Sequence, residues 1–221
     1  MSKDSATLLG IRHDAINAHH INMTKFPSRD DKGYEKFKHA LRYVVGDSFR
    51  PKPTEAFFEA IRHDDAATVK ASAKSYASEI LDGYAGKDHL TAVSYAAEHA
   101  TVEALRVLLA DCGAKPDLPD AKWHQRPLLR AAKGSRPGHI KIVEHLLNLN
   151  IHGRDEDVVV DAMDDDDQTA LAVAAEFGNM EIVRQLLEAG ADRDRCSMEG
   201  RTPLSRAREK SHADIVAILE R

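Results

Sequence analysis

Histidine is the residue type of this chain best suited to bind a metal or carry a proton, and the chain has 12 of them. Three lie in the stretch HDAINAHH, as His13, His19 and His20. One helix face presents two metal ligands well when they are four positions apart. None of these three histidines is four positions from another. We therefore expect solvated surface histidines here, and no metal or other cofactor.

A second distinctive stretch is acidic: RDEDVVVDAMDDDDQ at residues 154–168. Carboxylates are good calcium ligands, but this stretch lacks the DxDxDG spacing and the distal Glu of an EF-hand loop. Asp164 to Asp167 also precede a predicted helix, and a helix N-terminus favours negative charge. Three interpretations stay open, namely a solvated loop, a contact for a basic partner and a calcium site.

The sequence carries no familiar catalytic motif. A GxxxxGK[ST] phosphate loop, a GxGxxG stretch, a GxSxG elbow and an HExxH pair are all absent. The two cysteines, Cys112 and Cys196, form neither CxxC nor a cluster at zinc-ligand spacing. We therefore expect no disulfide framework and no structural metal, which is typical of a reducing compartment.

An internal repeat predicts the elements that position these side chains. Residues 169–187 and 202–219 match position by position at an offset of 33, with Thr169 on Thr202 and Leu171 on Leu204. Related stretches occur upstream, and the first of them is the weakest copy. Together they predict five units, which start near residues 55, 91, 126, 169 and 202.

Each unit is predicted to form two short helices. In the fourth unit, Leu171 and Ala174 share a face of the first helix, and Ile182 and Leu186 share a face of the second. Gly178 is expected to end the first helix, and Gly138 to do so in the third unit. One such pair cannot bury its apolar face alone, so the units must stack into a continuous core.

The repeats resemble the ankyrin repeat family over residues 55–221. The matching motifs are GRTPL at 200–204, the IV pairs at 142–143, 182–183 and 215–216, and GAD at 190–192. The resemblance implies an all-α helix-turn-helix solenoid over residues 54–221, with loops called fingers between units. It also implies that His139 and His212, at the family's Gly-His position, are structural.

The family binds proteins through a concave groove and its fingers, so the resemblance implies a protein partner. It places one exposed residue of each first helix in the groove: Glu59, Tyr95, Arg130, Val173 and Arg206. The full set of expected partner-binding residues is Tyr95, His99, Trp123, His124, Arg130, Glu176, Phe177, Arg193, Arg195, Met198 and Arg206. Aromatic, Arg and Met side chains are typical interface anchors. Trp123 either anchors a partner or packs beneath its own loop.

A rival hypothesis is an enzyme of isomerase or cyclase type on the same scaffold. Its acid–base residues would be His63, Tyr95, Glu98, His99 and Arg130 on adjacent units. No nucleophile–base pair is recognisable by spacing, and an extended array encloses little space. We therefore favour recognition, with no catalytic residues. A third hypothesis, an assembly chaperone, is indistinguishable from binding at this level.

Residues 1–53 do not repeat. Tyr34, Phe37, Leu41 and Val44 stand at helical spacing, which predicts a helical N-terminal extension that caps the first repeat. The alternative is a separate partner-binding or catalytic element.

Charge and hydropathy narrow the class of partner. The net charge is −5, and acidic residues outnumber basic ones over residues 54–221, which argues against nucleic acid as the main ligand. No apolar run approaches the ~18 residues of a membrane span, and the N-terminus is too polar for a signal peptide. We expect a cytoplasmic or nuclear protein that does not bind membranes. The oligomeric state is not indicated.

Overall fold

The computed structural model describes residues 55–74, 82, 89–149 and 158–220. The predicted helical extension at 1–53, its histidine cluster, and residues 154–157 of the acidic stretch lie outside the described residues. Residues 52–221 form one compact unit, which is described here by itself. Its described part contains ten α-helices and no β-strand.

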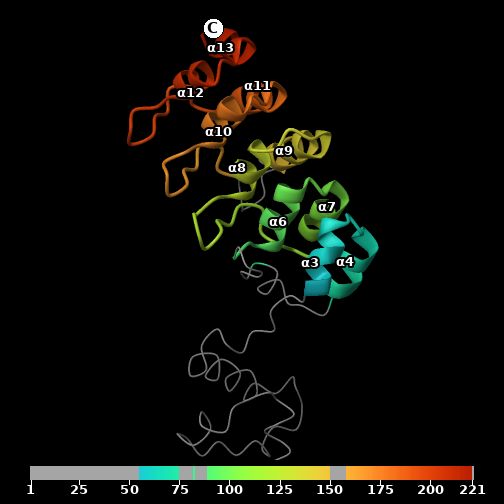
Figure 1. Ribbon diagram of the computed structural model, residues 1–221. Helices are drawn as coiled ribbons and strands as arrows, with labels where there is room; N and C mark the ends of the chain where they lie inside the picture. The colour runs from blue at the N-terminus through green and yellow to red at the C-terminus, as the bar shows by residue number, and fades with distance from the viewer. Residues whose placement is uncertain (1–54, 75–81, 83–88, 150–157, 221) are drawn as a thin grey trace, which may run out of the picture. The chain divides into compact units, whose positions relative to one another are not determined.

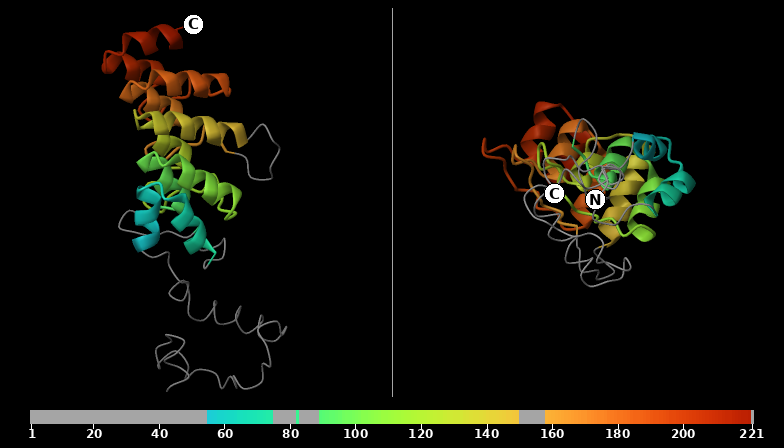
Figure 2. Two further views of the ribbon diagram at one scale, coloured as in Figure 1. Left: turned by 90° about the vertical axis from the view of Figure 1, so that its right-hand side faces the viewer. Right: turned by 90° about the horizontal axis from the view of Figure 1, so that it is seen from below.

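The ten helices form five consecutive pairs, which we call units one to five. The first helices of the units contact one another in series, and so do the second helices (Figures 1 and 2). This confirms the predicted all-α stack of helix pairs. The pairs are α3 (Glu55–Arg62) and α4 (Ala66–Ala73), α6 (Ala92–His99) and α7 (Val102–Ala110), α8 (Pro127–Ala132) and α9 (Pro137–Leu149), α10 (Ala170–Phe177) and α11 (Met180–Glu188), and α12 (Pro203–Glu209) and α13 (Ala213–Leu219).

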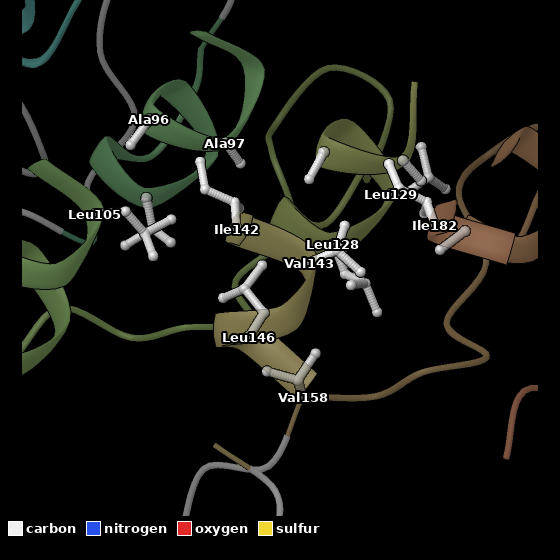
Figure 3. Close-up of a cluster of buried hydrophobic side chains, with 14 of the residues drawn as sticks. Ala96, Ala97, Leu105, Leu128, Leu129, Ile142, Val143, Leu146, Val158 and Ile182 are labelled. Carbon is white, nitrogen blue, oxygen red and sulfur yellow. The ribbon is translucent and has the colours of Figure 1, made fainter. Parts of the chain in front are cut away.

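Small side chains let the first helices approach closely. The alanine pairs 96–97, 131–132 and 174–175 are fully buried in α6, α8 and α10. The second helices contribute larger core residues, such as Leu105, Ile142 and Ile182, which lie against those alanines and their neighbours (Figure 3). Burying one such side chain stabilises the fold by about 1.5–3 kcal/mol. The core therefore runs continuously from unit to unit.

Threonine starts three of the five first helices. The Oγ1 atoms of Thr91, Thr169 and Thr202 each accept a hydrogen bond from the backbone N–H three residues later, at 3.1–3.2 Å. Gly178 ends α10 with a φ of 78°, as predicted. The corresponding prediction for Gly138 is wrong, because this glycine lies in the first turn of α9. There its lack of a Cβ lets the helix approach the carbonyl oxygen of Ala100.

Side chains near the start of the second helices bind the preceding unit. The Nε2 atom of His139 donates to Glu98 O at 3.1 Å, and that of His212 donates to Glu176 O at 3.0 Å. In unit four, Asn179 Nδ2 donates to a carbonyl of α8 at 2.7 Å. These bonds satisfy carbonyls that a helix C-terminus leaves open. The predicted structural role of both histidines is confirmed.

The fingers that connect units two to three, three to four and four to five extend to the same side of the array (Figure 1). The described part of each ends in a turn closed by a backbone hydrogen bond: Asp120 N to Gln125 O, Asp164 N to Gln168 O, and Ser197 N to Arg201 O. Neighbouring fingers are also joined. Asp117 Oδ2 accepts from Val159 N at 3.1 Å, and Asp161 Oδ1 accepts from Asp192 N at 3.0 Å.

Within the residues that the structure describes, no helix is both long and apolar enough to cross a membrane.

Candidate partner-binding site

A hollow of about 370 Å³ lies between the first helices of units two and three and the finger turns beside them. Polar and charged side chains form most of its wall. The lining residues are Glu98 of α6, Lys122, Trp123 and Gln125 of the finger between units two and three, Arg130 of α8, Lys133 just after α8, and Asp166 of the next finger.

Arg130 joins the finger to the helices at the wall of the hollow. Its Nη1 donates to Glu98 Oε2 at 2.5 Å, and its Nη2 and Nε donate to Asp120 Oδ2 at 2.8 and 3.2 Å. The Asp120 carboxylate is fully buried. Burial alone would raise its pKa, but hydrogen bonds from Trp123 N–H and from Arg130 outweigh burial, so the pKa is lowered. The finger turn is thereby fixed to α8.

The finger that carries Trp123 is also bound to the next finger. Asp165 N donates to Trp123 O at 3.1 Å, and the His124 ring lies 2.8 Å from Asp165 Oδ1. Gln125 Nε2 donates to Asp164 Oδ2 at 2.9 Å. Three contacts between the two turns therefore hold the backbone that carries Trp123.

Trp123 and two lysines form the open part of the wall. The Trp123 side chain is 47% exposed, and Lys122 Nζ lies 5.5 Å from its ring centre. The side chain thus does not pack fully beneath its own loop, and its role as a partner anchor stays a prediction. Lys133 Nζ donates to Gln125 Oε1 at 2.8 Å. Burial lowers the pKa of Lys133, and the nearby Arg130 guanidinium lowers it further.

Two of the five residues expected to be exposed in the groove are buried. Val173 is 0% exposed and belongs to the core, and Arg206 is 6% exposed. Both predictions of exposure are wrong, because α10 and α12 pack against each other: unit five covers Val173, and unit four covers Arg206. Arg206 Nη1 donates to Glu176 Oε2 at 2.6 Å, so these two predicted contact residues bind each other. Arg130 is likewise held inside the protein.

The other predicted contact residues are spread along the array. Tyr95 is half-buried and stacks on His99 with ring centres 4.1 Å apart. Phe177 is 56% exposed at the end of α10, and Met198 is 91% exposed on the last finger. Arg193 and Arg195 are exposed on that same finger, outside the hollow.

The residues of the enzyme hypothesis do not all line the hollow. The hollow is lined by Glu98 and Arg130, but not by Tyr95, His99 or His63. The Glu98 carboxylate is ion-paired with Arg130, and the His63 ring lies 3.5 Å from Glu59. No group of three or more potential metal ligands occurs in the described part of the chain.

The four consecutive aspartates have separate roles and do not form one acidic surface. Asp164 is buried and accepts from the N–H groups of Asp166 and Gln168, so it closes the turn. Asp165 binds His124, whereas Asp166 faces the hollow. Asp167 adopts a positive φ of 54°. Only Asp165 and Asp166 are exposed.

Sequence reasoning missed the residues that build the hollow around Trp123. Asp120, Gln125 and Lys122 were not selected, because no motif of the repeat marks them. One signal was available: each of two fingers begins its turn with Asp and ends it with Gln, as Asp120 to Gln125 and as Asp164 to Gln168. A side-by-side comparison of these turns would have identified the buried carboxylates.

The structure therefore defines a class, a solenoid of stacked helix pairs with a polar hollow beside its finger turns. Comparison with known families agrees with the resemblance noted in the sequence. The family described as ankyrin repeats, in three copies, matches residues 128–220. This part of the chain, which covers units three to five, belongs to the ankyrin repeats, and units one and two have the same helix-pair arrangement. Ankyrin repeats generally act as protein–protein interaction modules.

Proposed function

We propose that this chain is a protein-recognition module whose binding face consists of the first helices and the finger turns. The observation that carries the proposal is the exposed indole of Trp123 at the wall of the hollow. Tryptophan is the residue type most enriched among side chains that dominate binding energy. Here it is exposed on a surface built to hold it still.

The fixed finger supports a binding role for energetic reasons. Binding costs free energy when a loop must become ordered, and a loop already held in place avoids much of that cost. The Trp123 finger is held by the buried Asp120–Arg130 pair and by its contacts with the next finger. Phe177, exposed on unit four, extends the apolar contact area along the same row of helices.

No residue of the hollow favours the enzyme or the chaperone hypothesis over recognition. An acid–base enzyme needs a free proton carrier near its substrate, whereas Glu98 is ion-paired and His99 lies against Tyr95 outside the hollow. An assembly chaperone would bind its partner through the same face. Only its effect on the folding or assembly of that partner would distinguish it from a simple binding module.

Trp123→Ala tests the proposal most directly. The substitution removes an exposed side chain, so the fold should survive and binding of a captured partner should weaken by about 1–3 kcal/mol. The measurement is affinity capture from a lysate, followed by titration of each captured protein against the parent and the variant. Arg184→Ala, at an exposed site on α11, is the matched control and should leave binding unchanged.

Arg130 and Tyr95 are poor choices for this test, because their loss would disturb the protein itself. A partner that binds Trp123→Ala as tightly as the parent, but loses affinity for Arg184→Ala, would place the binding face on the second helices and contradict the proposal.

A further inference from the structure

Lys133 has the opposite charge to the residues at the same repeat position in units two and four. In units two and four this position, at the end of the first helix, is held by Glu98 and Glu176. Each carboxylate binds an arginine of the following unit, at 2.5 Å to Arg130 and at 2.6 Å to Arg206. In unit three the position carries the opposite charge, as Lys133.

Helix α10 of the next unit forms no ion pair with Lys133, although the Asp164 carboxylate in the finger before it acts on Lys133 through its charge. The residue there that corresponds to Arg130 and Arg206 is Val173, which is fully buried. The Lys133 ammonium instead donates to the neutral Gln125 Oε1. An ammonium has three N–H donors, and this bond uses one of them. Lys133 is therefore a half-buried cation without the ion pair that the repeat provides at its neighbours.

Among the charged side chains that line the hollow, those without an ion pair are mostly basic. Neither Lys122 nor Lys133 forms an ion pair with any residue that the structure describes; Lys122 instead lies over the Trp123 ring. Arg130 is shared between the wall residue Glu98 and the buried Asp120 behind the wall. Asp166 is the one wall carboxylate for which the described residues provide no side-chain partner. Two ammonium groups thus face one carboxylate.

Partial burial disfavours the charged form of Lys133. Loss of solvent lowers the pKa of Lys133, and Arg130 acts in the same direction. The carboxylates of Asp164, Glu98 and Asp120 act in the opposite direction but do not compensate for burial. An incoming anion would add to their effect, because an opposite charge at close range favours the protonated lysine.

We propose that the hollow accepts the carboxylate side chain of a Glu or Asp of the protein partner, bound by Lys133 and flanked by Trp123. This inference rests on the proposed recognition function and adds the chemistry of the recognised residue. A side chain fits better than a chain end, because exposed Phe177 on unit four offers further contact to a segment that continues past the hollow.

The test uses the full chain and a positional library of N-acetylated, C-amidated octapeptides in which one central residue is fixed. Trp123 is the only tryptophan of the chain, so its fluorescence reports occupation of the hollow directly. Peptides with Glu or Asp fixed should bind at least about tenfold more tightly than those with Gln, which is the size of effect that a charge-assisted bond supports.

Three variants make the test specific. Lys133→Met should abolish the preference for Glu and Asp. Lys133→Glu, which restores the residue type of units two and four, should reverse it toward Lys and Arg. Lys141→Glu makes the same change of charge on the exposed surface of α9 and should leave the preference as in the parent. Circular dichroism and melting establish that each variant is folded.

Two kinds of failure are distinguishable. Peptides that change Trp123 fluorescence but carry Gln, Lys or an apolar residue at the fixed position would overturn the acidic-residue inference and leave the recognition face intact. Binding that requires a free C-terminal carboxylate would also overturn it in favour of a chain end. A library in which no peptide changes the fluorescence would count against the recognition face itself.

Discussion

The junction between units two and three and the junction between units four and five carry the same polar arrangement. In each, a glutamate at the end of the first helix is bound twice by the next unit. Its carboxylate accepts from an arginine, and its backbone carbonyl accepts from a histidine. The residues are Glu98, Arg130 and His139 at one junction, and Glu176, Arg206 and His212 at the other.

The two junctions differ at the finger. Asp120 begins the turn beside Arg130 and binds its Nε and Nη2. Ser197 begins the turn beside unit five, and both its Oγ and Arg206 Nε are buried without a hydrogen-bond partner. The glutamate–arginine pair between helices is thus present at both junctions, but only at the first does the arginine also bind the finger turn. We call that finger anchored; it carries Trp123 and lines the hollow.

The largest expected effect comes from removing the arginine at the anchored junction. Arg130→Ala leaves the fully buried Asp120 without its cation, and breaking a buried pair in this way costs about 3–5 kcal/mol of unfolding free energy. Arg206→Ala breaks a pair whose glutamate is partly exposed and should cost only about 1 kcal/mol. Urea unfolding of both variants provides the comparison.

Hydrogen exchange adds a local measurement to this prediction. Exchange should speed up at residues 120–126 in the Arg130 variant, because the finger loses its attachment to α8. Equal losses of stability in the two variants would mean that the finger anchor contributes nothing beyond the helix-to-helix pair.

Ser197→Asp should give the junction between units four and five the finger contact that Asp120 provides at the junction between units two and three. The new carboxylate would stand where Asp120 and Asp164 stand in their turns, within reach of Arg206 Nε and of the turn's backbone N–H groups. Satisfying a buried donor adds about 1 kcal/mol to the unfolding free energy. The melting temperature of the single variant, and of Ser197→Asp combined with Arg206→Ala, measures the effect.

The combined variant controls for the source of the stabilisation. If Asp at position 197 works through Arg206, most of the gain should vanish when the arginine is absent, apart from the part due to the turn N–H groups. A destabilised single variant would show that the two turns, although alike in backbone hydrogen bonding, do not offer equivalent space.

These junctions also show which parts of the structure the sequence could predict. The helix pairs were predictable because Leu171, Ile182 and their equivalents recur at fixed spacing, and buried packing repeats with the sequence. The roles of His139 and His212 followed from the family pattern. Exposure of Val173 and Arg206 was predicted wrongly, because a single helix does not reveal how much of its surface the neighbouring units cover.

The hollow was not predictable for a related reason. Asp120, Gln125 and Lys133 come from different loops and helix ends, and they meet only through the stacking of units. Sequence spacing within one unit contains no information on such contacts between units. The aligned repeats already show that Lys133 stands where unit two has Glu98. They do not show the consequence, because Glu98 pairs with an arginine of the next unit, and the corresponding residue after Lys133 is Val173.

The smallest effect concerns pH and the histidine of the anchored junction. His139 accepts from Arg136 N at its Nδ1 and donates from Nε2 to Glu98 O, an arrangement that requires the neutral ring. Burial lowers its pKa below the ordinary value of 6.5, with the charge of Arg136 contributing. The unfolded chain therefore binds the proton more readily than the folded protein.

It follows that the stability contributed by neutral His139 is complete above pH 6.5 and falls as the pH drops from 6.5 toward the lower folded-state pKa. His139→Asn keeps the donor to Glu98 O, as Asn179 does in unit four, but cannot titrate. Urea unfolding from about pH 8 to about pH 5 should show parent stability falling relative to this variant, by at most about 1.4 kcal/mol per pH unit. His139→Ala, which lacks the donor, should be less stable than the Asn variant throughout. A parent that gains stability relative to His139→Asn as the pH falls would show that the folded protein prefers the charged ring, contrary to its hydrogen bonds.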